Sequence, residues 1–153
     1  MLSVTTDEMI RRLGCLVGTR LRGGEVIELV GDVGAGKTTF VKGIGEGLQV
    51  DDDVQSPSFN ISRVYSCRDG LELHHYDLYR LSVAGVMEYE LAESLQQPHA
   101  VTVIEWAETV HNVLPEQRLV ITINYQPQDE GRQVTMQLPN GFEYLFVLQG
   151  DIA

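Results

Sequence analysis

Basic residues are scarce in this chain, and their scarcity bears on its partners. The 153 residues include 11 lysines and arginines against 22 aspartates and glutamates, which gives a formal net charge of −11 at pH 7. A protein that binds nucleic acid through its own surface normally presents a basic face. We therefore expect any action on nucleic acid to be indirect, through a partner. The acidic surface suits a partner with a basic patch, although solubility alone explains it equally well.

Long apolar runs and paired cysteines are also missing. No stretch approaches the ~20 apolar residues of a membrane span, and residues 1–7 have neither the basic region nor the apolar core of a secretory signal. Cys15 and Cys67 lie far apart without a C-x-x-C pattern, which favours two reduced thiols over a disulfide or a zinc site. Cytoplasmic residence is the expectation. Because no repeat or linker is visible, residues 1–153 are predicted to form a single domain.

A glycine-rich stretch at residues 31–39 fits the pattern G-x-x-x-x-G-K-[ST] without a gap. Residues 25–30 before it read as a short buried strand, and apolar residues at helical spacing follow it over 40–48. Strand, glycine loop and helix start in this order form a cradle whose backbone N–H groups bind phosphate. The alternative is a glycine-rich turn that happens to contain Lys and Thr. The context on both sides favours binding of a nucleoside triphosphate.

Two side chains of this loop have distinct expected roles. Lys37 would reach the β- and γ-phosphates, and the hydroxyl of Thr38 would ligate Mg²⁺. The chain contains neither N-K-x-D nor D-x-x-G, so guanine specificity is not expected. The predicted nucleotide-binding residues of the loop are Asp32, Val33, Gly34, Ala35, Gly36, Lys37, Thr38 and Thr39.

Segments on either side of the loop offer further contacts. An apolar stripe at 3.6-residue spacing predicts a helix that starts at Thr6 and Asp7 and ends before Gly23. Its first turn could lie near the base or ribose, which makes Thr6 and Asp7 candidate nucleotide contacts, or the two residues could only cap the helix. Ser56 and Ser58 flank a proline and suit a switch that senses the γ-phosphate and Mg²⁺, or an ordinary Ser-Pro turn.

A predicted hairpin over 59–66 and 71–79 carries the next candidates. On its second strand His75, Asp77 and Tyr79 share one face. Asp77 could hold Mg²⁺ through water or orient the attacking water, with His75 and Arg80 nearby. Alternatively, Asp77 could simply pair with Arg80 at the strand end. The residues alone leave both interpretations open.

Residues 100–106 form a continuous apolar run that ends in a carboxylate, as a Walker B strand does. Such a strand is buried on both faces, so its last residue emerges at the sheet edge beside the phosphate loop. Glu105 would therefore bind the Mg²⁺ shell or polarise water, or it could be merely a polar residue that ends a core strand. Trp106 is expected to be buried, as core or as a partner anchor.

The remaining pattern predicts the rest of the fold. A helix follows from Ser82 to about residue 95, and strands are expected over 119–125, 133–138 and 142–148, the last two joined by an Asn-Gly type I′ turn. These strands should extend the sheet antiparallel. The predicted fold class is α/β, a P-loop NTPase-like three-layer fold with a central, mostly parallel sheet, added antiparallel strands and helices on both faces.

Four segments in order carry a family resemblance: G-D-V-G-A-G-K-T-T-F at 31–40, S-P-S-F at 56–59, H-Y-D-L-Y-R-L at 75–81 and I-E-W at 104–106. Together they resemble the TsaE (YjeE) family of small bacterial ATPases over nearly the whole chain. The resemblance implies an ATP- and Mg²⁺-dependent enzyme needed to form N6-threonylcarbamoyladenosine next to the anticodon of tRNA. It also implies TsaD and TsaB as protein partners, with tRNA contacted only indirectly.

The resemblance also implies roles for single residues. It assigns Lys37 and Thr38 to phosphate and Mg²⁺, Asp77 to catalysis or metal, and Glu105 to Mg²⁺. It further assigns Ser56 and Ser58 to a switch and makes Trp106 a functional position. One departure is visible at Ser58, where family members usually have Thr, so the stiffness of a β-branched side chain is lost.

Two other functions remain as alternatives. A small-molecule kinase would require a basic lid whose arginines bind the phosphates. The middle of the chain contains only Arg63, Arg68 and Arg80, and these do not form an arginine cluster in the sequence. A nucleotide-sensing module without meaningful turnover is the second alternative. For an ATPase, hydrolysis by the isolated chain should be slow, because Arg80 is the only evident internal candidate for an arginine finger.

Overall fold

The sheet is the frame on which the rest of the chain is arranged. The computed structural model describes residues 1–57, 61–81, 85–126 and 131–153. Within them, seven strands form one sheet in the order β1-β7-β6-β2-β5-β4-β3. Their bounds are β1 Leu2–Val4, β2 Val26–Val30, β3 Ser62–Ser66, β4 Glu72–Asp77, β5 Ala100–Glu105, β6 Leu119–Tyr125 and β7 Arg132–Gln137.

The centre of this sheet is parallel and its margins are antiparallel. β2 pairs in parallel with β5 and β6, and β5 pairs in parallel with β4. β3 runs antiparallel to β4, and β7 runs antiparallel to both β6 and β1. The predicted fold class, a mostly parallel sheet with antiparallel strands added, is confirmed. The expectation that residues 119–125 would extend the sheet antiparallel is wrong, because β6 pairs in parallel with β2 and only β7 runs antiparallel to it. All six residues of β5 are buried, as a strand enclosed by neighbours on both sides and covered on both faces requires.

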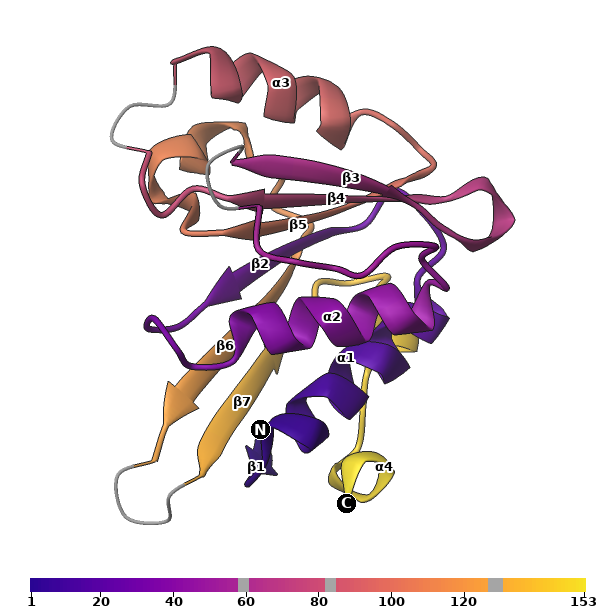
Figure 1. The fold of residues 1–153 in the computed structure, drawn as a ribbon, viewed down its shortest axis with the longest axis vertical. Coiled ribbons are helices and arrows are strands. Elements are labelled where there is room, and N and C mark those ends of the chain that lie inside the picture. Colours follow the sequence, from indigo (N-terminus) through magenta and orange to yellow (C-terminus); the bar gives the residue numbers. More distant parts are fainter. Residues whose placement is uncertain (58–60, 82–84, 127–130) are drawn as a thin grey trace.

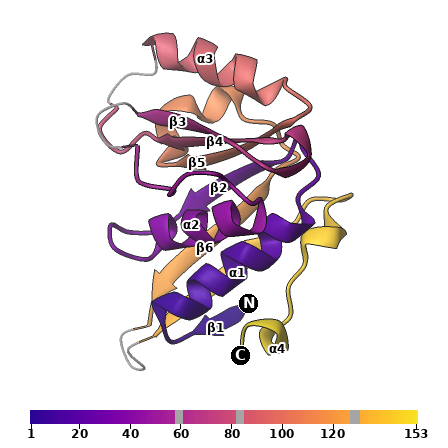
Figure 2. The ribbon, with the colours of Figure 1, turned by 45° about the vertical axis from the view of Figure 1, so that its right-hand side comes forward.

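Helices cover both faces of the sheet, as predicted, but unevenly (Figures 1 and 2). α1 (Asp7–Arg20) and α2 (Lys37–Gly47) pack on one face over the larger buried cluster, and α3 (Gly85–Leu95) and the 3-10 helix η3 (Ala107–Val113) pack on the other. The short elements are η2 Arg68–Gly70, η4 Glu143–Leu145 and α4 Gln149–Ile152. The α3 layer lies over β3, β4 and β5, and within the described ranges no helix covers the same face of β6 and β7 (Figure 1).

α1 has the start and the buried stripe that its sequence predicts. The side chain of Thr6 caps the helix by accepting a hydrogen bond from the Met9 N–H at 3.2 Å, and Asp7 and Glu8 occupy the first turn. Ile10, Leu13 and Val17 are fully buried on the face toward the sheet. The capping role considered for Thr6 is therefore the one the structure shows.

α1 and α2 lie so close that glycines form their contact. A Cβ atom added to Gly43 on α2 would lie 2.1 Å from the Arg11 carbonyl oxygen on α1. We expect Gly43→Ala to destabilise the fold by about 3 kcal/mol, because backbone on both sides must move apart. Thermal unfolding measures this. Gly150→Ala is the matched control, since the added Cβ meets nothing within 4 Å; equal melting temperatures for the two variants would contradict the packing.

The C-terminal segment corrects one prediction. Residues 142–148 do not form a strand, and no hairpin joins them to β7; they form η4 and an extended segment before α4. The physical reason is that β1 already occupies the free edge of β7, through the register Leu2 to Val134. Leu145 and Val147 instead bury their side chains in the α1 side of the core. The alternation of buried and exposed side chains over residues 145–148 reflects this burial and not a sheet face.

β1 itself was not predicted, because three residues give too short a pattern to recognise. Its two apolar residues, Leu2 and Val4, are buried, and Gln149 of α4 makes two hydrogen bonds with the backbone of Ser3, at 2.8 and 2.9 Å.

Cys15 and Cys67 are both free thiols, as predicted. Among the described helices, none has the length and apolar content needed to cross a membrane.

Candidate nucleotide-binding site

The loop between β2 and α2 has the backbone geometry of a phosphate cradle. Gly34 and Gly36 have φ angles of 80° and 115°, a region that L-residues with side chains rarely adopt. At Gly36 an added Cβ would also lie 2.7 Å from Ile10 of α1. α2 then begins at Lys37, so the unpaired N–H groups of its first turn follow the loop directly.

The register of the sheet brings three separate segments to this loop. Asp77 at the end of β4 pairs with Glu105 at the end of β5, and Glu105 pairs with Leu29 of β2 on its other side. The carboxyl ends of these parallel strands therefore meet beside the glycine loop. A cleft of about 290 Å³ lies there; its lining residues are Asp7, Val33, Gly34, Gly36, Lys37, Thr38, Thr39, Asp77, Tyr79, Glu105, Trp106 and Arg132.

Lys37 is buried at the base of this cleft. Its ammonium group donates hydrogen bonds to the carbonyl oxygens of Gly31 and of Asp32, the second at 3.0 Å. Burial lowers the pKa of Lys37, and the negative charges of Glu105 and Asp77 oppose that shift. The carboxylates therefore help to keep a cation available where phosphate would bind.

Asp77 is held from two directions. Its Oδ1 accepts a hydrogen bond from the Tyr79 N–H at 3.1 Å, and its Oδ2 accepts one from the Ser56 hydroxyl at 3.4 Å. The candidate switch residue Ser56 thus contacts the candidate catalytic carboxylate. The other switch candidate, Ser58, lies outside the described residues. Arg80 is exposed and is not among the side chains that line the cleft.

Glu105 has one oxygen engaged with a histidine. His75 is fully buried, and its Nε2 lies 2.7 Å from Oε2 of Glu105, which is itself only 3% exposed. The Nδ1 of His75 has no hydrogen-bond partner among the described residues. A tautomer of His75 that carries a hydrogen on Nε2 can donate to Glu105 and fix the orientation of its carboxylate.

Trp106 lies at the edge of the cleft and is half-buried, where burial had been predicted. Its backbone is left-handed, with φ of 59°, and this turns the chain sharply after β5. The ammonium of Lys37 lies 4.4 Å from the centre of the indole ring, and the Tyr79 ring packs 4.9 Å away. The indole thus covers one side of the cleft and contacts the residue proposed to bind phosphate.

Arg132 is a cleft residue that the sequence did not suggest. At the start of β7, its guanidinium donates to the Ala35 carbonyl at 3.1 Å and to the Asp7 carboxylate at 2.5 Å. Asp7 therefore lies in the cleft through this pair, whereas Thr6 is not among the lining side chains. No motif marks Arg132, because its position depends on β7 folding back beside β6, close to the glycine loop.

The residues present suit a magnesium nucleotide better than a bare metal ion. Within the described ranges, no three His, Cys, Asp or Glu side chains form a cluster that could hold a metal alone. Mg²⁺ normally uses one or two carboxylates together with phosphate oxygens and water. The hydroxyl of Thr38 and the carboxylates of Asp77 and Glu105, which line one cleft beside a phosphate cradle, match that requirement.

Comparison with known proteins places this geometry in a family. The family described as "Threonylcarbamoyl adenosine biosynthesis protein TsaE" matches residues 4–134. The protein named "tRNA threonylcarbamoyladenosine biosynthesis protein TsaE" of Streptomyces coelicolor is 42% identical over 132 residues, covering 83% of this chain and 88% of that protein. The protein of the same name from Bacillus subtilis is 36% identical over 143 residues, covering 90% and 85%.

A solved structure agrees with the sequence comparison. The crystal structure of Bacillus subtilis YdiB superposes with a TM-score of 0.70 at 34% identity and covers 94% of this chain and 88% of that one. The family match and the relatives together extend over most of the chain, including the glycine loop and the ends of β4 and β5. The chain belongs to the TsaE family.

Proposed function

We propose that this chain is a Mg²⁺-dependent ATPase subunit that supports formation of N6-threonylcarbamoyladenosine on the tRNA adenosine next to the anticodon. It acts in the cytoplasm with the proteins TsaD and TsaB and touches tRNA only through them. The observation that carries the proposal is the single cleft in which a phosphate cradle meets Asp77 and Glu105. The names of the relatives from Streptomyces coelicolor and Bacillus subtilis supply the pathway.

Several cleft residues, and two side chains that hydrogen-bond to them, have separate tasks in this reaction. The backbone N–H groups from residue 32 to residue 39 and the ammonium of Lys37 bind the phosphates. Thr38, Asp77 and Glu105 are the groups that would hold Mg²⁺, which supplies positive charge to the β- and γ-phosphate oxygens. His75 orients Glu105 through its 2.7 Å hydrogen bond. Ser56, which donates to Asp77, links the segment after α2 to this carboxylate.

The cleft favours hydrolysis over phosphoryl transfer to a small molecule. Kinases of that kind surround the transferred phosphate with several arginines, whereas Arg132 is the only arginine among the described lining residues. We therefore expect a partner to supply the arginine finger that stabilises the transition state, and turnover by the isolated chain should be slow.

Phosphate release from ATP tests the proposal. The purified chain should release phosphate slowly, and addition of TsaD and TsaB should raise the rate by about tenfold or more. Formation of the modified nucleoside on tRNA by TsaD and TsaB should then require both this chain and ATP. A phosphorylated small molecule in place of free phosphate would show a kinase, and partner binding that is equal with ATP, ADP and no nucleotide would show that the nucleotide does not control assembly.

Arg132 gives a prediction specific to this cleft. Arg132→Ala removes the guanidinium that holds the Ala35 carbonyl of the loop. We expect the dissociation constant for ATP to rise about tenfold, because a charge-assisted hydrogen bond contributes roughly 1.5–3 kcal/mol. Quenching of the fluorescence of Trp106, the single tryptophan, measures binding. Arg12→Ala, an exposed site on α1, is the matched control, and equal affinities for the two variants would contradict the role.

A further inference from the structure

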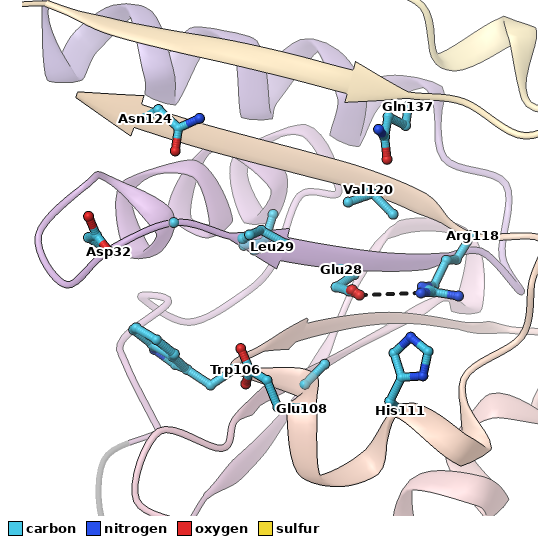
Figure 3. Close-up of a pocket in the computed structure, with 13 residues that line it drawn as sticks. Glu28, Leu29, Asp32, Trp106, Glu108, His111, Arg118, Val120, Asn124 and Gln137 are labelled. Atoms are coloured by element: carbon cyan, nitrogen blue, oxygen red, sulfur yellow. Dashed lines mark hydrogen bonds and ion pairs between the residues drawn. The ribbon is translucent and has the colours of Figure 1, made fainter. Parts of the chain in front are cut away.

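A second and larger hollow lies on the face of the sheet that α3 leaves uncovered. Its volume is about 590 Å³, and Figure 3 shows it between β2, β6 and β7 on one side and η3 on the other. Val120 and Asn124 of β6 and Gln137 of β7 form its floor, and Glu108 and His111 approach from η3 (Figure 3). These residues lie on the opposite face of the sheet from the α1 and α2 layer.

The hollow continues into a groove. A neighbouring depression of about 270 Å³ shares Arg118, Val120 and Gln137 with it and adds Glu116 and Pro139. At its other end the large hollow reaches Asp32 of the glycine loop and Trp106, which also lines the nucleotide cleft. We call this continuous feature, from Asp32 and Trp106 to Glu116 and Pro139, the sheet-face groove. An elongated groove accommodates an extended chain better than a compact small molecule.

The charge along the sheet-face groove is negative. Glu28 is paired with Arg118 at 3.4 Å, so these two charges offset each other (Figure 3). Asp32, Glu108 and Glu116 are all exposed, and none has an ion-pair partner in the part of the chain that the structure describes. They lie at both ends and in the middle of the groove. The charge that remains available to an occupant is therefore carboxylate.

The floor offers hydrogen bonds that no other part of the described chain uses. The side-chain amides of Asn124 and Gln137 are exposed and have no intramolecular partner among the described residues. Both point into the groove from neighbouring strands (Figure 3). Each amide carries a donor and an acceptor, so the pair suits the N–H and C=O groups of an extended backbone.

We propose that the sheet-face groove binds an extended, arginine- or lysine-rich segment of a protein partner. Basic side chains of the segment pair with Asp32, Glu108 and Glu116, while Asn124 and Gln137 bind its backbone. Nucleic acid is a poor occupant because its phosphates would face these carboxylates. A second copy of this chain is equally unsuited, because each copy carries a net charge of −11.

The proposal goes beyond the ATPase assignment, and its test needs no ATP. The full chain, labelled with ¹⁵N, is titrated with the blocked peptide Ac-GRGRGRGR-NH2, and backbone, side-chain amide and indole N–H signals are followed by NMR. We expect shifts confined to the groove, including the side-chain amides of Asn124 and Gln137. A peptide with glutamate in place of each arginine should cause none. The Thr38→Ala variant removes a proposed Mg²⁺ ligand from the nucleotide cleft without changing the net charge, and Thr38 does not line the groove. It should bind the arginine peptide as the wild type does, which separates this result from any failure of ATP hydrolysis.

Charge reversal provides the quantitative test. The double variant Glu108→Lys and Glu116→Lys should weaken binding of the arginine peptide by about tenfold or more. The matched control is Glu90→Lys with Glu93→Lys on α3, which makes the same change in net charge at exposed sites away from the groove and should change binding less than about twofold. Equal weakening by the two double variants, shifts that map elsewhere, no shifts at all, or the same groove shifts with an RNA oligonucleotide would overturn the proposal.

Discussion

Replacement of Lys37 by alanine should lower ATP turnover about a thousandfold, which is the largest effect we expect from any single substitution. The side chain is 6% exposed and lies between the carbonyls of the glycine loop, the Trp106 ring and the two carboxylates. No other lysine can substitute for it, because Lys42 is the only other lysine and is exposed one turn along α2.

Lys42→Ala is therefore the matched control for Lys37→Ala. It removes the same side chain from the same helix. Turnover should stay within about twofold of wild type, because substitutions at surface positions away from the binding cleft have small effects. Steady-state phosphate release, measured with TsaD and TsaB present, gives the comparison. Thermal unfolding of both variants shows that the loss does not come from misfolding. A Lys37→Ala protein that hydrolyses ATP at the wild-type rate would exclude the cleft as the site of reaction.

Glu105→Gln should lower kcat about a hundredfold and raise the Mg²⁺ concentration needed for half-maximal rate. The amide oxygen of glutamine can still accept the hydrogen bond from His75, so the fold should keep most of its stability. What is lost is the negative charge of the carboxylate. Binding of a divalent cation depends strongly on that charge, whereas the hydrogen bond from His75 does not require it. The Mg²⁺ titration distinguishes this cause from a general loss of activity.

Glu108→Gln is the control for Glu105→Gln. It makes the same chemical change three residues along the chain, at an exposed position that does not line the nucleotide cleft. Its Mg²⁺ dependence should match wild type. If Glu105→Gln and Glu108→Gln give the same Mg²⁺ curve, Glu105 has no part in metal binding and the role proposed for β5 is wrong.

The sequence was most informative where structure is local. The glycine loop, α1 and the buried strand β5 were predicted because spacing over a few residues determines each of them. The ends of the parallel strands then followed, since parallel neighbours must bring Asp77 and Glu105 to the same edge. Most of the candidate cleft could thus be predicted without coordinates.

The features that the sequence did not suggest all depend on contacts between distant segments. β1 takes the edge of β7, and the predicted C-terminal hairpin therefore does not form. Arg132 reaches the glycine loop only because β7 lies next to β6. The uncovered sheet face depends on how far α3 extends over β4 and β5. None of these arrangements leaves a periodic signal in the residues involved.

A crystal structure of the chain with Mg²⁺ and a non-hydrolysable ATP analogue tests most directly whether three segments converge on one magnesium-bound triphosphate. The triphosphate should lie against the backbone N–H groups of residues 32–39, with Lys37 on its β- and γ-phosphates. Thr38 should ligate the metal, with Asp77 and Glu105 bound to it directly or through one water. A metal ion beyond the reach of both carboxylates, or a nucleotide bound outside this cleft, would contradict the account.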